Sequence, residues 1–336
     1  MSKVLCFGEL LLRFSPQLNG DWITECNMPV YVGGAELNTA TALARWGIPV
    51  RYFTALPDHY LSREIISHVA EKGIEINNIK FSGNRIGTYY LPQGTDLKGA
   101  GVIYDRAYSS FWKLQPGQVD WDAVFEGVDW FHFSAICPAL NKNVALVCKE
   151  ALAAATKKGI TCSVDLNYRA KLWQWGKQPV EVMPDLAAHC QIIMGNIWAA
   201  EKMLGIAVDK NIKDNKEAYL QQSHETSKGI LNIFPSCKQV AHTFRFDTGG
   251  EINYYATLYK EAQLFVSQEQ QTRHIVDKVG SGDTFMAGLI YGIKKDWSAQ
   301  KTVDFAAAAA FNKLFIRGDA TTAMVEQIQN GILTHG

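Results

Sequence analysis

The sequence lacks the features that mark membrane-spanning, secreted and nucleic-acid-binding chains. No window in its 336 residues reaches the roughly 18 uninterrupted apolar residues that a spanning helix needs. Lysine and arginine (33) balance aspartate and glutamate (33), and no run of five basic residues occurs. Neither nucleic acid nor a membrane is therefore an expected partner. The N-terminal stretch has a short apolar run but no small-residue cleavage site after it, so no signal peptide is expected.

Disulfides and a protein-held metal centre are not expected either. The seven cysteines are odd in number, widely spaced and without a C-x-x-C pair, which is typical of reduced core cysteines. The eight histidines show no metal-binding spacing. These observations together predict a cytoplasmic location.

Two common nucleotide-binding motifs are also missing. The sequence has no G-x-x-x-x-G-K-[ST], which excludes a P-loop. Gly280-Ser281-Gly282 is followed by Asp283, Thr284 and Phe285, whereas a dinucleotide fingerprint needs glycine or alanine at the last of these positions.

The pattern that is present is a repeated alternation of apolar strands and helices with short links. This alternation predicts an α/β fold, a three-layer α/β/α sandwich with a mostly parallel sheet, formed as one domain over residues 1–336. Two β-prone, glycine-punctuated regions, about 10–31 and 84–108, predict a small antiparallel sheet outside the main one. The expected strands cover 4–7, 50–55, 128–133, 160–165, 192–194 and a hairpin of 240–246 with 252–259, and the expected long helices cover 35–46, 62–72, 142–158, 199–204, 214–228 and 299–315.

The segment 276–292 combines the strongest local signals in the chain. An apolar, strand-like stretch, 274–276, leads into a turn, Gly280 to Asp283, and then a helix with small and apolar residues at helical spacing. Main-chain amides at the start of this helix favour an anion. A carboxylate beside them makes sense if Asp283 takes a proton from an attacking hydroxyl. The alternative is that Asp283 simply caps the helix.

Further polar clusters follow other expected strands, at the sheet edge where α/β proteins bind ligands. Gly33-Gly34 opens the first long helix, which carries Asn38. Asp165, Asn167 and Arg169 would point the same way in an extended run, and an arginine there suits a carboxylate or phosphate. Taken singly, turn-forming and capping roles explain these clusters about as well. The alanines 306–310 form a smooth helix face, suited to tight packing or to contact with an adenine ring.

With these residues in view, the chain resembles the ribokinase-like (PfkB) sugar kinases along nearly its whole length, and most of all the 2-keto-3-deoxygluconate kinases. The family's C-terminal motif, D-T-x-G-A-G-D, is similar to DKVGSGD at 277–283. The resemblance extends to VGGAELN at 32–38, YDR at 104–106, DLNYR at 165–169, LW at 172–173 and RGD at 317–319.

The resemblance implies an ATP-dependent kinase that phosphorylates the terminal hydroxyl of an acid sugar, with Mg²⁺ and a possible monovalent cation as cofactors. It implies a homodimer formed through the small sheet, which would be a lid over the sugar. Asp283 would be the general base, beside the amides of Gly280, Ser281 and Gly282. The implied sugar-binding residues are Gly33, Gly34, Asn38, Tyr89, Tyr104, Arg106, Arg169 and Asp283. The implied nucleotide-binding residues are Asn167, Asn196, Arg245, Gly280, Gly282 and Asn312, and no metal ligand is assigned.

The chain departs from the family pattern mainly at its nucleotide end. The N-x-x-E motif ends in Ala199 instead of glutamate, and Glu201 lies two positions late. The G-x-x-G turn is replaced by Gly249-Gly250, and Asp105 stands where relatives often have a second tyrosine. Two alternatives therefore stay open, a kinase of a neutral sugar such as fructose or ribose, and a sugar-binding relative with impaired catalysis.

Overall fold

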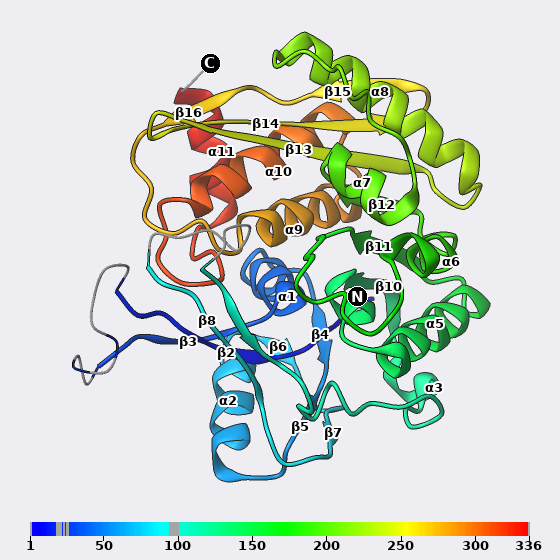
Figure 1. Ribbon diagram of the computed structural model, residues 1–336, viewed down its shortest axis with the longest axis vertical. Helices are drawn as coiled ribbons and strands as arrows, with labels where there is room; N and C mark the ends of the chain where they lie inside the picture. The colour runs from blue at the N-terminus through cyan, green and yellow to red at the C-terminus, as the bar shows by residue number, and fades with distance from the viewer. Residues whose placement is uncertain (1, 18–21, 23, 25–26, 94–100, 335–336) are drawn as a thin grey trace.

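The structure is a computed structural model that describes residues 2–17, 22, 24, 27–93 and 101–334 (Figure 1). Parts of the two β-prone regions, 10–31 and 84–108, and one of the seven cysteines, Cys26, lie outside this described part. The other six cysteines are free and buried, in agreement with the prediction. Among the described helices, none is long and apolar enough to cross a membrane.

A ten-stranded sheet runs through the molecule, with the order β15-β14-β13-β12-β11-β10-β1-β4-β6 and with β16 paired to β14. All pairings from β13 through β12, β11, β10, β1 and β4 to β6 are parallel, and β14, β15 and β16 pair antiparallel at one end. The strands are β1 (Lys3–Phe7), β4 (Val50–Phe53), β6 (Ile74–Glu75), β10 (Val128–Ser134), β11 (Thr161–Asp165), β12 (Ile192–Gly195), β13 (Gln239–Thr248), β14 (Glu251–Lys260), β15 (Gln263–Val266) and β16 (Gln270–Thr272). The mostly parallel sheet predicted from the sequence is confirmed.

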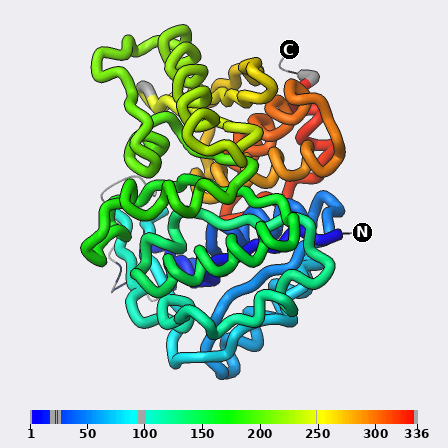
Figure 2. The backbone as a smooth tube through the Cα atoms, turned by 90° about the vertical axis from the view of Figure 1, so that its right-hand side faces the viewer, coloured from blue at the N-terminus to red at the C-terminus, as the bar shows by residue number. Residues whose placement is uncertain are grey.

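Helices cover both faces of this sheet and complete three layers (Figures 1 and 2). In β1 the side chains alternate, so Val4 and Cys6 join one core while Leu5 and Phe7 join the other. The first core is closed by α1 (Ala35–Arg45), α2 (Tyr60–Ala70), α9 (Ser281–Lys294), α10 (Ala299–Lys313) and α11 (Val325–Thr334). The second is closed by α3 (Trp121–Val124), α4 (Ile136–Ala139), α5 (Lys142–Lys157), α6 (Met183–Ala187), α7 (Ile197–Leu204) and α8 (Lys216–Ile233).

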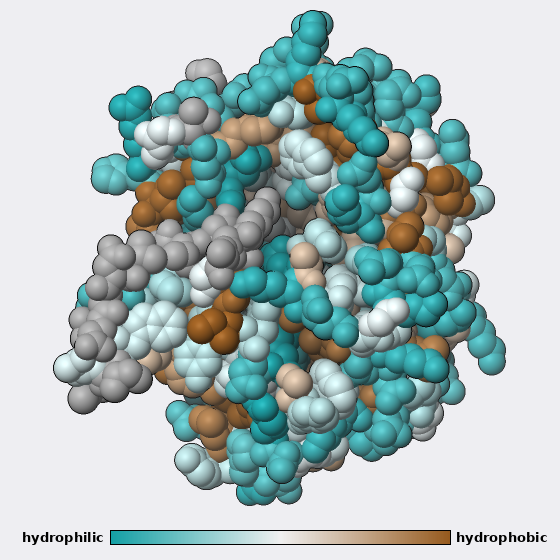
Figure 3. Space-filling view, viewed as in Figure 1, coloured by the Kyte–Doolittle hydropathy of each residue, from teal (hydrophilic) through white to brown (hydrophobic). Residues whose placement is uncertain are grey.

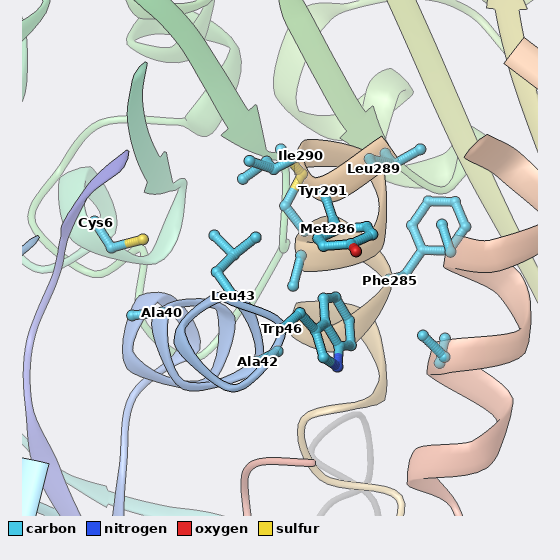
Figure 4. Close-up of a cluster of buried hydrophobic side chains, with 14 of the residues drawn as sticks. Cys6, Ala40, Ala42, Leu43, Trp46, Phe285, Met286, Leu289, Ile290 and Tyr291 are labelled. Atoms are coloured by element: carbon cyan, nitrogen blue, oxygen red, sulfur yellow. The ribbon is translucent and has the colours of Figure 1, made fainter. Parts of the chain in front are cut away.

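Close packing of α9 fixes where the predicted anion-binding turn lies. Figure 4 shows Leu43 of α1 directed toward Met286 and Ile290 of α9. On its other side α9 meets α10, where a Cβ on Gly288 would overlap Ala306. The alanines 306–310 are buried in this contact, and none of them is among the described residues that line the cavity below. Their burial favours tight packing over contact with an adenine ring.

The small sheet has the order β3-β2-β8-β9 and lies beside the main one (Figure 1). Its strands are β2 (Leu11–Phe14), β3 (Val30–Gly33), β8 (Gly87–Tyr90) and β9 (Ile103–Asp105). The outer pairs are antiparallel as predicted, while the central pair, β2 with β8, is parallel. A separate two-stranded ladder joins β5 (Ala55–Leu56) to β7 (Lys80–Phe81).

The strand predicted over 274–276 is wrong. The chain leaves β16 at Thr272 and crosses to α9 without pairing in a sheet. The amides of Val276 and Asp277 instead bond to the Leu314 carbonyl after α10, and Val276 is 47% exposed. An apolar triplet is too short to distinguish such a crossing from a strand.

Candidate active site

One cavity of about 750 Å³ opens at the carboxyl ends of β1, β11 and β12, between the main sheet and the small one. Figure 3 shows the surface hollowed near the middle of this face. Thirteen of the predicted site residues line it: Gly34, Asn38, Tyr89, Tyr104, Arg106, Asn167, Arg169, Asn196, Arg245, Gly280, Ser281, Gly282 and Asp283. Two predicted residues, Gly33 and Asn312, are not among the described residues of its lining.

The anion-binding turn, Gly280 to Asp283, lies at the N-terminus of α9 and faces the cavity. Gly280 has φ 79°, and a Cβ there would overlap the carbonyl oxygen of Asp319, so only glycine fits. A Cβ on Gly282 would meet nothing within 4 Å. The first hydrogen bond within the helix is donated by the Thr284 amide to the Gly280 carbonyl. The three amides before it, of Ser281, Gly282 and Asp283, precede the first bond of the helix and belong to residues that line the cavity, which suits an anion site.

Asp283 is buried in the first turn of α9, and its side chain makes no capping hydrogen bond. Asn38 Nδ2 donates to Asp283 Oδ2 at 2.7 Å, and Thr39 Oγ1 donates to the Asp283 carbonyl at 3.1 Å. Both partners belong to α1, so the α1–α9 contact positions this carboxylate. The capping alternative raised from the sequence is wrong.

The electrostatic surroundings of Asp283 suit a general base. Burial, with a smaller contribution from the nearby carboxylates of Asp165 and Glu36, raises the pKa of Asp283 to about 8. The Asn38 amide and the Arg169 guanidinium oppose this shift. A carboxyl group with a pKa near working pH can accept a proton in the transition state and is deprotonated often enough to do so.

Asp165 ends β11, and it lines the same cavity as Asn167 and Arg169. The extended run expected after Asp165 is not present, because the strand ends there and the neighbouring Tyr168 lines the cavity too. The Asn167 amide donates to Asp165 Oδ1 at 3.0 Å, which turns the chain at the end of the strand. Burial raises the pKa of Asp165 to about 6, against the opposing effects of the Asn167 amide and Arg169. Arg169 is only partly buried and donates to the neighbouring Tyr168 carbonyl, so most of its donors can reach a ligand.

Arg106 lines the cavity too, but its charge is balanced inside the protein. Its Nε donates to Glu9 Oε2 at 2.6 Å, and both side chains are buried. Ser109 Oγ also donates to the Glu9 carboxylate. Sequence reasoning did not assign a role to Glu9, whose only signal is that it is the single charged residue between Val4 and Leu12. Of the two predicted arginines, Arg106 is neutralised by Glu9, whereas Arg169 has a positive charge that can pair with the carboxylate of a substrate.

The two predicted tyrosines come from adjacent strands of the small sheet, with ring centroids 6.2 Å apart. Tyr89 Oη donates to Asp319 Oδ2 at 3.1 Å, which fixes its ring at the cavity wall. Asp105, next to Tyr104, is exposed and pairs with Arg85 at 2.7 Å on the outside. Asp105, which stands where relatives often have a second tyrosine, therefore does not line the cavity.

The part of the cavity lined by Asn196 and Arg245 is where the family resemblance places the nucleotide. The glutamate expected there is replaced by Ala199, and basic residues lie nearby in the lining. The Asn196 side chain caps α7 by accepting from the Ala199 amide at 2.7 Å, and Ala199 itself is buried. Glu201 accepts from the Val208 amide and does not line the cavity. The basic residues at this end are Lys202, Arg245 and Lys278, of which the last two pair with Asp247. Such a wall matches a polyanion such as a triphosphate.

The residues present fit a Mg²⁺ ion carried largely by phosphates. Within the described residues there is no group of three or more histidine, cysteine, aspartate or glutamate side chains that could hold a metal alone. Mg²⁺ in phosphoryl-transfer sites is usually held by one or two carboxylates together with substrate phosphates and water. Asp165 and Asp283 are carboxylates at the cavity wall that could serve this way.

The comparisons with known proteins decide the class. A sequence profile described as pfkB family carbohydrate kinase matches residues 1–321. The chain belongs to this family. It is therefore a sugar kinase, a phosphotransferase that uses ATP and acts on an alcohol group, and the ribokinase-like fold predicted from the sequence is confirmed.

Individual relatives agree with this assignment. The crystal structure of a 2-dehydro-3-deoxygluconokinase from Thermotoga maritima is 34% identical, covers 100% of both chains and superimposes with a TM-score of 0.89. A 2-dehydro-3-deoxygalactonokinase from Haloferax volcanii is 25% identical over 336 residues, which is 98% of this chain and 96% of the relative. A fructokinase from Xylella fastidiosa with bound ATP has a TM-score of 0.75 at 19% identity, over 99% of this chain and 98% of that one, and shows the same fold.

Proposed function

We propose that this kinase transfers the γ-phosphoryl group of ATP to the terminal hydroxyl of 2-keto-3-deoxygluconate, giving 2-keto-3-deoxy-6-phosphogluconate. One observation carries the proposal. The buried carboxylate of Asp283, the anion-binding turn and the partly exposed guanidinium of Arg169 all line a single cavity. That arrangement provides a base, a phosphate site and a carboxylate partner for one substrate.

At the acid end, Arg169 is the residue that selects a sugar with a carboxylate. A bidentate arginine–carboxylate pair is both strong and geometrically selective. A neutral sugar would leave the guanidinium desolvated and unpaired, which is costly. Tyr89, Tyr104 and Arg106 form the wall next to it, with Arg106 held in place by Glu9. Asn38 binds Asp283, and Gly34 lies against the Glu9 carbonyl, and both residues line the same cavity.

At the reacting end, the main-chain amides of the anion-binding turn stabilise charge on the phosphoryl group as it is transferred. Asp283 takes the proton of the attacking hydroxyl. Asn167, Asn196 and Arg245 lie along the wall that would face ATP, together with Lys278. Bound Mg²⁺ would neutralise phosphate charge, with Asp165 and Asp283 as the available carboxylates.

Several sequence predictions remain part of this proposal. The small sheet, with strands in about 10–31 and 84–108, serves as a lid that excludes water from the cavity. It also pairs two subunits in a homodimer, as the family resemblance implies. We also keep three other predictions as parts of the proposal: that residues 1–336 form one domain, that the protein is cytoplasmic, and that it uses a monovalent cation. Gly33 and Asn312 keep their proposed roles only as residues that support the wall from outside the cavity.

One observation favours a second candidate, a sugar-binding relative with impaired catalysis. Ala199 replaces the expected glutamate, and no carboxylate among the described residues near it compensates within the cavity. Calorimetry separates the candidates. The impaired binder would hold the sugar but not ATP at any Mg²⁺ concentration, whereas the kinase binds both.

A substrate panel tests the proposal directly. ADP release is measured with 2-keto-3-deoxygluconate, 2-keto-3-deoxygalactonate, fructose and ribose under identical conditions. The proposal expects the acid sugars to be preferred at least about tenfold in kcat/KM, the effect of one good charged contact. Equal rates on all four would reject the acid specificity, and a preference for fructose or ribose would favour the neutral-sugar kinase.

A further inference from the structure

Arg13 is a buried arginine in the small sheet that no role described so far uses. It lies on β2 with 2% of its surface exposed, and it is not among the described residues of the cavity lining. Its Nε donates to Asp319 Oδ1 at 2.7 Å and its terminal NH2 donates to Asp277 Oδ2 at 2.9 Å. The guanidinium also stacks over the Tyr31 ring at 4.4 Å. Arg13 thus connects the small sheet to two loops more than 260 residues away.

Both carboxylates that bind Arg13 hold the anion-binding turn in place. Asp277 accepts hydrogen bonds from the Val279 amide at 3.0 Å and the Gly318 amide at 3.1 Å, and it lies three residues before the start of the turn. The carbonyl of Asp319 packs directly against Gly280, where a Cβ would overlap it. The turn therefore takes its position from Asp277 and Asp319, and Arg13 sets the distance between them.

The same cluster reaches the sugar end of the cavity. Tyr89 is the residue paired with Arg13 across the β2–β8 ladder, and its hydroxyl donates to Asp319 Oδ2 at 3.1 Å. The loop after α10, which carries Asp319, runs beside β2 and β8 in Figure 1. Tyr89 is thus connected to Asp319 directly by its hydroxyl, and Arg13, its partner in the ladder, binds the same carboxylate.

Arg13, Asp277 and Asp319 form a cluster that is largely shielded from water, so a change in its geometry would leave charges unpaired. Arg13 and Asp319 are buried, and the buried ammonium of Lys313 donates to the Ile316 carbonyl at 2.8 Å close by. Separating charges in such surroundings leaves them unpaired and away from water, at a high free-energy cost. Because breaking these contacts is costly, the small sheet and the anion-binding turn are expected to move together when the lid closes.

We propose that Arg13 is a positioning residue that couples sugar binding at the small sheet to phosphate binding at the anion-binding turn. The inference rests on the proposed function, because it assumes that the sugar contacts Tyr89 and that ATP contacts the turn. It assigns to Arg13 a coupling between the two sites, so the sugar raises the affinity for ATP, and ATP raises the affinity for the sugar by the same factor.

Calorimetry measures this coupling. The Kd of a non-hydrolysable ATP analogue with Mg²⁺ is determined with and without saturating 2-keto-3-deoxygluconate, in the full-length protein. The wild type is expected to bind the analogue at least about fivefold more tightly with the sugar, within the usual range of such couplings. In Arg13→Met the ratio falls to about 1, even if both separate affinities also change.

Arg51→Met is the matched control. Arg51 is likewise a buried arginine on a strand and outside the described cavity lining. Its carboxylate partner, however, is Glu75, at 2.6 Å, instead of Asp277 and Asp319. This variant is expected to lose stability and to keep the wild-type ratio. A ratio that falls in Arg51→Met as in Arg13→Met would reduce the effect to general destabilisation and overturn the proposal.

A second variant keeps the test decisive if Arg13→Met does not fold. Asp277→Asn keeps the size of the side chain and one accepting oxygen, which can retain the bond from the Val279 amide, but it loses the charge that binds Arg13 and the second oxygen, and it is expected to lower the ratio likewise. The coupling proposal is overturned if the folded variants keep the wild-type ratio, or if the wild type has none. Absence of sugar binding to the wild type would instead reject the proposed function.

Discussion

The substitution Asp283→Asn tests catalysis and electrostatics in one residue. Asparagine keeps the shape of the side chain and an oxygen that can accept from Asn38 Nδ2, so sugar affinity should change little. It cannot accept the proton of the attacking hydroxyl. A positioned general base contributes about 10²- to 10⁴-fold, so kcat should fall by that factor while the sugar Kd stays within about threefold.

The raised pKa of Asp283 adds a stability prediction whose sign is fixed. The folded protein raises this pKa from 3.8 to about 8, so folding favours the protonated carboxyl. Its contribution to stability is fully present below about pH 4 and is lost as the pH rises through about 8. The loss is about 1.4 kcal/mol for each pH unit between these values, or on the order of 5 kcal/mol in total.

Asp283→Asn removes this pH-dependent cost, because the amide stays neutral. The variant should therefore be about as stable as the wild type near pH 4.5 and more stable by several degrees in Tm at pH 8.5. The kcat/KM of the wild type should rise tenfold per pH unit up to about pH 8 and then level off.

The assays are ADP release for kcat, calorimetry for the sugar Kd and thermal unfolding from pH 4.5 to 8.5. Asp185→Asn serves as a surface control, since Asp185 forms only an exposed pair with Lys149. Retention of more than a tenth of kcat in Asp283→Asn would refute the role of the base. A Tm difference that does not grow with pH would refute the account of its burial.

Three further outcomes follow from the same geometry. Arg169→Ala should lower kcat/KM for the acid sugar by about tenfold or more, roughly the size of the wild-type preference, and leave the neutral sugars nearly unchanged, and an unchanged preference in the substrate panel would show that the assigned role is wrong. Gly280→Ala should unfold at a lower temperature and lose activity, because φ 79° and the Asp319 carbonyl exclude a Cβ, as differential scanning calorimetry and ADP release would show. Gly282→Ala should fold normally, since nothing lies within 4 Å of its Cβ, but should weaken ATP binding because the methyl group enters the phosphate space. Equal Tm values for the two glycine variants would contradict this account.

Most of the fold was predictable because its signals are local. Buried parallel strands such as β1 and β10 are short apolar runs, and helices such as α5 begin and end at recognisable residues, Asn141 and Gly159. Glycine patterns likewise located the anion-binding turn and the start of α1. The strand expected at 274–276 failed because pairing depends on a partner strand, which no local pattern reveals.

The site could be predicted only in part, because several of its features depend on pairs distant in the chain. No spacing shows that Glu9 balances Arg106, which is 97 residues away, or that Arg13 binds Asp319, 306 residues away. The placement of Asn312 and Gly33 outside the cavity is equally invisible in the sequence. Residue types showed which chemistry was present, whereas the burial and pairing that decide which charges stay available required the structure.

The most direct test of the central claim is the ratio of kcat/KM for 2-keto-3-deoxygluconate to that for fructose, measured by ADP release in the wild type and in Arg169→Ala. The account predicts a ratio of at least about ten in the wild type, falling to near one in Arg169→Ala, and a kcat lower by about 10²- to 10⁴-fold in Asp283→Asn. A ratio near one in the wild type, or one that survives the loss of Arg169, would contradict it.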